Sequence, residues 1–343
     1  MTFTMSIGFQ FYKRRFRQYG PLIIVMFIFF MGIFYLSASP DLQHPSFRKH
    51  LALNNAINKD ILKLERKVKL LESTLKKHNI PESEYMEGLL PVIYVITPTH
   101  ARPQQKAELT RLKNVFLHVP ALHWILVEDS EQKTGLVKHF LESGGISFTH
   151  LNVPTPKDWK LGENQPVWQK PRGVLQRNAG LDWLRSNFEP PASRAVVYFA
   201  DDDNTYSTEL FQEMRWTKKV SVWPVALVGG VMVERPKVTL SGKVNGWLTG
   251  WKPDRAFATD MAGFGINLDL LVNNPEAEFS LDSQKGFMES DFLEKIVKLH
   301  ELEPKADMCT KVYIWHTRTE KPNMKDEEKL RKEGRPTNRN IEV

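Results

Sequence analysis

The chain has 343 residues, enough for one large or two modest domains, and 47 Lys and Arg against 40 Asp and Glu give it a formal net charge of +7. Residues 1–90 hold 13 of these basic and 7 of these acidic side chains, so residues 91–343 are close to neutral. A nearly neutral body argues against nucleic-acid binding, which needs a basic face. The only cysteine, Cys309, excludes an intrachain disulfide and a cysteine-rich zinc site.

An apolar run at residues 22–38 is at the short end of what spans a bilayer. Basic side chains between Lys13 and Arg17 precede the run, and Asp41 follows it. This asymmetry favours a cytoplasmic tail at residues 1–21 and a body on the far side of the membrane. A cleaved signal peptide is the alternative, but the apolar run is longer than a usual signal-peptide core. The sequence therefore predicts an uncleaved, single-pass type II anchor.

Residues 39–90 are predicted to form a stem with a short coiled coil. Residues at heptad spacing fall into two sets: Asn54, Ile61, Val68 and Leu75 at a positions, and Ile57, Leu64 and Leu71 at d positions. Mostly β-branched a residues with mostly leucine at d favour a parallel dimer, and one asparagine at a would fix the register. Three heptads are few, so a lone amphipathic helix is the alternative. The pattern predicts a homodimer.

Strand and helix patterns alternate from about residue 91. Apolar stretches at residues 92–96, 124–127, 146–151 and 195–200 read as strands, with helical patterns between them. Such alternation is typical of a parallel α/β sheet that binds a nucleotide beyond the carboxyl ends of its strands. We expect one body at residues 91–343, with a nucleotide-binding half at 91–206 and a second ligand-binding half at 207–343.

Carboxylates follow two of the predicted strands. Asp201, Asp202 and Asp203 come directly after the strand at 195–200, and Asp129 follows the strand at 124–127. A triple acidic cluster is electrostatically costly unless a cation is present, and oxygen ligands suit Mg²⁺ or Mn²⁺. An acidic turn that caps a helix starting near Ser207 is the alternative for the triplet. Two strand ends with carboxylates are more than an acidic turn explains.

The second half is irregular and aromatic. Its aromatic residues could stack on sugar faces, with nearby charged side chains for the hydroxyl groups, or they could simply pack in the core. The aromatic residues are Trp247, Trp251, Phe257 and Phe264, and the charged ones are Glu234, Arg255 and Asp260.

Two further stretches carry candidate chemistry. Glu289 opens an amphipathic helix, where it could complement the helix dipole or act as a general base. His316 and Arg318 follow a last predicted strand at 311–315, where they could bind a diphosphate or be ordinary surface residues.

Several long strings in the body resemble the animal β-1,3-glucuronyltransferases over roughly residues 90–343. The strings are Thr97-Pro98-Thr99, Pro171-Arg172-Gly173-Val174, Gln176-Arg177-Asn178, Tyr198 to Tyr206 around the acidic triplet, Asp260 to Phe264, and Trp315 to Pro322. The anchor and stem agree with the type II layout of that family.

The resemblance implies a GT-A type nucleotide-sugar glycosyltransferase fold, with a mixed central sheet and flanking helices. It implies Mn²⁺ as cofactor, UDP-glucuronate as donor and inverting transfer to the 3-hydroxyl of a terminal galactose. The acceptor would be the Gal-β1,3-Gal end of the linkage region on a proteoglycan core protein. The implied location is the Golgi membrane, with the catalytic domain in the lumen.

The resemblance also implies roles for single residues. Glu289 would be the catalytic base and Asp203 the metal ligand. Acceptor contacts would come from Glu234, Trp251, Arg255 and Asp260. Donor contacts would come from His100, Asp129, Arg172, Arg177, Asp201, Asp202, Lys285, His316 and Arg318.

These residue types suit the chemistry. A metal and cationic side chains would stabilise the charge that develops on a UDP leaving group. A single carboxylate base and no covalent carboxylate would give inversion, as in inverting glycosidases. The family usually has tyrosine where this chain has His100, so stacking on uracil would involve a smaller ring here.

Three other functions are weighed against this one. A related enzyme would act on terminal N-acetyllactosamine of glycoproteins or glycolipids, or on both acceptors. A Golgi-anchored scaffold without catalysis predicts a missing catalytic group, whereas all the charged positions are present. A nucleotide-sugar hydrolase would release free glucuronate without an acceptor.

Overall fold

The structure is a computed structural model, and it describes residues 90–160, 170–190, 195–339 and 341–343. The predicted anchor at 22–38 and the predicted coiled coil of the stem lie outside these ranges and stay predictions. Within the described ranges, no helix is long and apolar enough to cross a membrane.

The central sheet of the described body is mixed. Its seven strands run in the order β11 (Glu303–Pro304), β6 (Val220–Val222), β10 (Phe264–Asn267), β4 (Val196–Phe199), β1 (Ile93–Thr99), β2 (Leu122–Glu128) and β3 (Ser147–Asn152). β1 is parallel to β2 and β4, and β2 is parallel to β3. The parallel sheet predicted from the alternation thus covers β1 to β4, while β10 is antiparallel to both of its neighbours.

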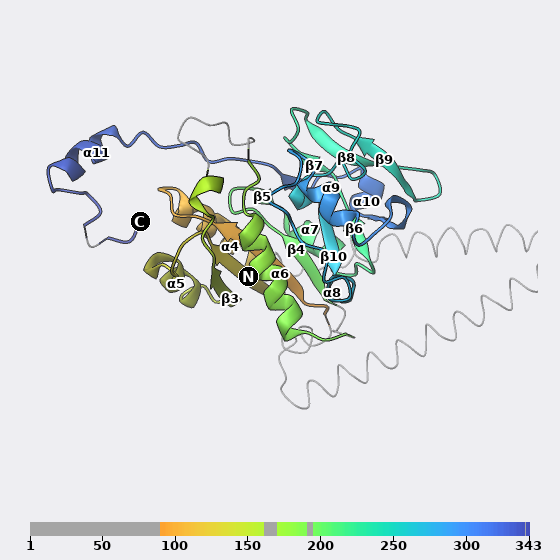
Figure 1. The fold of residues 1–343 in the computed structure, drawn as a ribbon, viewed down its shortest axis with the longest axis horizontal. Helices are drawn as coiled ribbons and strands as arrows, with labels where there is room; N and C mark the ends of the chain where they lie inside the picture. Colours follow the sequence, from red (N-terminus) through yellow and green to blue (C-terminus); the bar gives the residue numbers. More distant parts are fainter. Residues whose placement is uncertain (1–89, 161–169, 191–194, 340) are drawn as a thin grey trace, which may run out of the picture. The chain divides into compact units, whose positions relative to one another are not determined.

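Helices cover both faces of this sheet (Figure 1). Alternate residues of β1 belong to different cores: Ile93 and Val95 pack with α4 (Gln105–Phe116) and α5 (Gly135–Glu142), whereas Tyr94 and Ile96 pack with α6 (Val174–Asn187). Burial on both faces explains why these strands read as continuous apolar runs. α7 (Thr208–Met214) belongs to the same core as α4 and α5.

A second sheet is built from short strands. Its order is β5 (Thr205–Tyr206), β12 (Ile314–Trp315), β7 (Val225–Ala226), β8 (Val233–Val238) and β9 (Val244–Leu248). β7 and β8 are antiparallel, and Gly229 and Gly230 lie between them with positive φ angles, which glycine adopts readily. β12 pairs with β5, which brings the chain after residue 315 back to the segment after β4.

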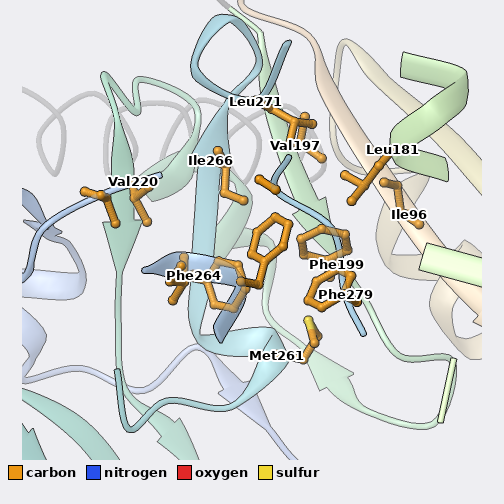
Figure 2. Packing of buried hydrophobic residues seen from close by; sticks show 14 of the residues in the cluster. Ile96, Leu181, Val197, Phe199, Val220, Met261, Phe264, Ile266, Leu271 and Phe279 are labelled. Atoms are coloured by element: carbon orange, nitrogen blue, oxygen red, sulfur yellow. The ribbon is translucent and has the colours of Figure 1, made fainter. Parts of the chain in front are cut away.

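Aromatic packing fixes the short helix that carries Glu289. In Figure 2, Phe199 of β4 lies beside Phe264 and Phe279, and their ring centroids are 5.9 and 5.1 Å from that of Phe199. Phe292 of α9 (Met288–Leu293) stacks on Phe279 at 4.3 Å. α9 is therefore packed, through Phe292, against Phe199, the last residue of β4.

The remaining elements are short. They are the 3₁₀ turns η1 (Lys157–Trp159), η2 (Met261–Gly263) and η3 (Leu299–Glu301), and the helices α8 (Leu268–Val272), α10 (Ala306–Cys309) and α11 (Lys325–Lys332).

Candidate active site

Three parallel strands end at one edge of the central sheet, and candidate residues follow each of them. β1 leads to His100, β2 to Asp129, and β4 to the acidic triplet. Because β10 is antiparallel to β4, the segment before β10, which contains Asp260, lies at the same edge. We call Asp129, the triplet and the arginines that contact it the strand-end cluster.

Asp201 and Asp202 are neutralised by arginines. Arg177 Nη2 lies 2.6 Å from Asp201 Oδ1, and Arg102 Nη2 lies 2.6 Å from Asp202 Oδ1. Thr99 also donates a hydrogen bond of 2.7 Å to Asp202. Neither carboxylate caps α7, so the alternative of an acidic capping turn does not describe the triplet.

Asp203 differs from its two neighbours. Within the described residues, its carboxylate accepts no hydrogen bond and forms no ion pair, while its main-chain carbonyl accepts from Arg111 at 2.6 Å and from Thr317 at 2.7 Å. Partial burial, followed by the charges of Asp201 and Asp202, raises the pKa of Asp203 to about 6. An unpaired carboxylate with a raised pKa is the group that gains most from a nearby cation.

The acidic triplet therefore fits a divalent cation with one protein ligand. No group of three or more His, Cys, Asp or Glu side chains in the described ranges is arranged to hold a metal. A cation at Asp203 would take its other ligands from a bound molecule or water, which is how Mg²⁺ and similar ions bind with phosphates.

The start of α6 places two arginines at the same edge. Gly173 has a φ of +67°, and a Cβ there would lie 2.7 Å from Arg177 Nη1, so glycine leaves the space that this guanidinium occupies. Arg177 Nη1 donates to the carbonyl of Arg172 at 2.8 Å. Partial burial lowers the pKa of Arg172, and Asp201 opposes this shift. Arg172 forms no ion pair with the described residues, so its charge is available to an anionic ligand.

The segment after β12, a strand of the second sheet, contacts the triplet. The amide of His316 donates to the carbonyl of Ala226 at 2.9 Å, and Thr317 contacts Asp203 as described. Burial raises the pKa of Asp260, and the charge of His316 opposes this shift most strongly. The charge of His316 acts on both Asp203 and Asp260, while Arg318 is exposed.

A second group, the loop cluster, consists of Glu234, Trp251 and Arg255, and Lys285 lies beside it. Glu234 is buried, accepts a hydrogen bond from Thr249 and lies 3.7 Å from Arg255 Nη2. Arg255 donates to the carbonyls of Lys252, Gly286 and Trp251 at 3.1, 3.1 and 2.8 Å. Lys285 Nζ lies 5.8 Å from the centre of the Trp251 ring. These loops therefore hold each other mainly through main-chain carbonyls.

Of the four aromatic residues considered for sugar stacking, three are core residues. Trp247, Phe257 and Phe264 are buried, whereas Trp251 is 41% exposed. Trp251 is the one member of this set that is substantially exposed to solvent.

Glu289 is influenced by the charges of both clusters, through Arg177 of the first and Arg255 of the second. It is half-buried in the first turn of α9, and Ser290 beside it accepts a hydrogen bond from the amide of Phe257 at 3.1 Å. Burial, followed by the charge of Asp260, raises the pKa of Glu289 to about 7, and Arg255 opposes this shift. A carboxylate with a pKa near neutrality is suited to accept a proton as a general base.

The structure also gives the contacts of Asp129 and His100, the two candidates that directly follow β2 and β1. Asp129 Oδ1 accepts from the amide of Thr155 at 2.7 Å and lies 3.8 Å from Lys160 Nζ. His100 is exposed, with its Nδ1 3.3 Å from Arg102 Nη1.

The sequence analysis missed three residues that organise the triplet: Arg102, Arg111 and Thr317. Arg102 joins Asp202 to the buried Glu108, and its place in the loop after the first strand was a usable signal. Arg111 and Thr317 donate hydrogen bonds to a main-chain carbonyl, and the sequence carries no signal for contacts of this kind.

Comparisons with known proteins identify the family of the chain. The model of glycosyltransferase family 43 matches residues 112–320. Human galactosylgalactosylxylosylprotein 3-beta-glucuronosyltransferase 3 is 53% identical over 263 residues, which cover 74% of this chain and 78% of that protein. The human proteins numbered 2 and 1 in the same series are 57% and 53% identical over 242 residues each, covering 70% of this chain and 73% and 72% of the relatives. With these matches, the chain belongs to glycosyltransferase family 43.

Proposed function

We propose that the chain transfers glucuronic acid from UDP-glucuronate to the 3-hydroxyl of a terminal galactose, with inversion. The observation that carries the proposal is Glu289, a half-buried carboxylate in the first turn of α9 with a pKa of about 7, which is influenced by the charges of Arg177 and Arg255 from the two clusters. The names of the relatives, 3-beta-glucuronosyltransferases, support the same reaction.

We assign the strand-end cluster to the donor. Arg172, which forms no ion pair within the described residues, suits the carboxylate of glucuronate or the diphosphate, and His316, Arg318 and Lys285 suit the diphosphate. Asp129 and His100 would hold the uridine. Asp203 would hold Mn²⁺, which when bound neutralises the diphosphate of the leaving group.

We assign the loop cluster to the acceptor. The exposed ring of Trp251 offers an apolar face for a sugar, while Glu234, Arg255 and Asp260 offer hydrogen-bonding groups beside it. Glu289 would then take the proton from the attacking hydroxyl, and with no second carboxylate acting as nucleophile the product is inverted.

We further propose that the acceptor is Gal-β1,3-Gal of the proteoglycan linkage region, and that the enzyme is a homodimer anchored as a type II protein in the Golgi membrane. The acceptor proposal follows the names of the relatives. The anchor and dimer proposals rest on the apolar run at 22–38 and the heptads at 54–75.

The test is a transfer assay with the full chain, UDP-glucuronate and Mn²⁺, offering Galβ1-3Gal and Galβ1-4GlcNAc side by side. We expect transfer with a strong preference for Galβ1-3Gal. Comparable use of both would replace the linkage-region proposal by a broad acceptor range. Free glucuronate without transfer would indicate a hydrolase, and UDP binding without any turnover would indicate a non-catalytic protein.

A further inference from the structure

Asp203 is held in a different way from the other two aspartates of the triplet. Arginines bind the carboxylates of Asp201 and Asp202, whereas Arg111 binds only the main-chain carbonyl of Asp203, at 2.6 Å. The main chain at Asp203 is thus fixed, while the Asp203 carboxylate has no hydrogen bond or ion pair among the described residues.

The same carbonyl is also a junction between distant segments. Thr317 donates to it at 2.7 Å, and Thr317 Oγ1 lies 3.1 Å from Thr205 Oγ1. Arg111 comes from α4, and its Nη1 lies 3.5 Å from Thr319 Oγ1. One carbonyl therefore joins α4, the acidic triplet and the segment that carries His316 and Arg318.

The placement of Arg111 is costly as a purely structural arrangement. It forms no ion pair within the described residues, and its Nε is buried without a hydrogen-bond partner. A buried, unsatisfied donor normally destabilises a fold. A charged donor nevertheless makes a stronger hydrogen bond to a carbonyl than a neutral one, so it fixes the orientation of the peptide group after Asp203.

We propose that Arg111 is a positioning residue, which holds the main chain at Asp203 so that the Asp203 carboxylate can contact a divalent cation bound to a nucleoside diphosphate. This inference rests on the function proposed above. Because Arg111 acts through a main-chain carbonyl, it would affect metal-dependent nucleotide binding and leave metal-independent nucleotide binding unchanged. The partners that orient a metal ligand typically contribute about 10–100-fold to metal affinity.

The test is calorimetric titration of the full chain with UDP, with Mn²⁺ and separately with a chelator. For Arg111→Met we expect binding about tenfold weaker with Mn²⁺ and unchanged binding in the chelator. Lys113→Met is the matched control, since it removes a positive charge from the same helix, where Lys113 Nζ instead lies 4.7 Å from the Phe140 ring. It should bind as the wild type does in both conditions.

Thr317→Val removes the other donor to the Asp203 carbonyl and is a second, independent test of the positioning role. It should weaken Mn²⁺-dependent binding several-fold, in the same selective way, and it decides the question if Arg111→Met does not fold. Wild-type-like Mn²⁺-dependent affinity, or an equal loss with and without metal, would overturn the proposal. If the wild type itself fails to bind UDP with Mn²⁺, the proposed function fails; if the wild type binds and the variants match it, only the positioning role fails.

Discussion

The strand-end cluster and the loop cluster are built by different means. In the strand-end cluster, charged side chains follow buried parallel strands and pair directly, as Arg177 does with Asp201 at 2.6 Å. In the loop cluster, Arg255 is held by three main-chain carbonyls and lies 3.7 Å from its nearest carboxylate, on Glu234.

From this difference we infer that the strand-end cluster is the more rigid of the two and that the loop cluster adapts more easily. Strands buried on both faces fix the direction of the residues that follow them, which suits a donor that is the same in every reaction. Loops that hold each other through carbonyls can change with a few substitutions, which suits acceptor selection. We therefore expect substitutions in the two clusters to affect donor and acceptor parameters separately, with Glu289 affecting the chemical step.

The largest effect is expected at Glu289. Glu289→Gln keeps the shape of the side chain but removes the proton acceptor, so kcat should fall by about 10²–10⁴-fold. Steady-state kinetics with saturating donor and acceptor measure this loss, and UDP affinity with Mn²⁺ serves as the control. Turnover close to that of the wild type would remove Glu289 as the base.

The pH dependence should reveal the same group. A general base must be ionised, and burial and Asp260 raise the pKa of Glu289 to about 7. With saturating donor, acceptor and Mn²⁺, kcat should be level above that pH and fall about tenfold for each unit below it. A profile that stays level down to pH 5 would contradict the raised pKa in the active complex.

A smaller and more selective effect is expected at Trp251. Trp251→Ala removes an aromatic side chain that is 41% exposed, so the acceptor KM should rise about fivefold, corresponding to about 1 kcal/mol of lost stacking. The KM for UDP-glucuronate should stay unchanged. Trp247→Phe is a useful contrast, because Trp247 is buried and should affect thermal stability without this selective change. An equal rise in both KM values on Trp251→Ala would show that the clusters are not independent.

The sequence predicted the strand-end cluster better than the loop cluster for physical reasons. An apolar run such as residues 195–200 identifies a strand, and the residues after it, Asp201 to Asp203, must lie at its end. The antiparallel β10 was not apparent from the alternation, because strand direction depends on long-range pairing. Periodicity also could not separate Trp251 from the buried Trp247, since exposure in irregular segments is decided by tertiary packing. The contacts of Arg111 and Thr317 with one carbonyl required coordinates.

The central claim is that Asp203 serves donor binding through a metal, whereas Glu289 serves the chemical step. The most direct measurement is calorimetric titration of UDP with Mn²⁺ into the wild type, Asp203→Asn and Glu289→Gln. We predict that Asp203→Asn loses Mn²⁺-dependent affinity by about 100-fold or more, because a direct ligand contributes at least as much as the groups that orient it. Glu289→Gln should bind as the wild type does. Unchanged binding in Asp203→Asn, or an equal loss in both variants, would contradict the account.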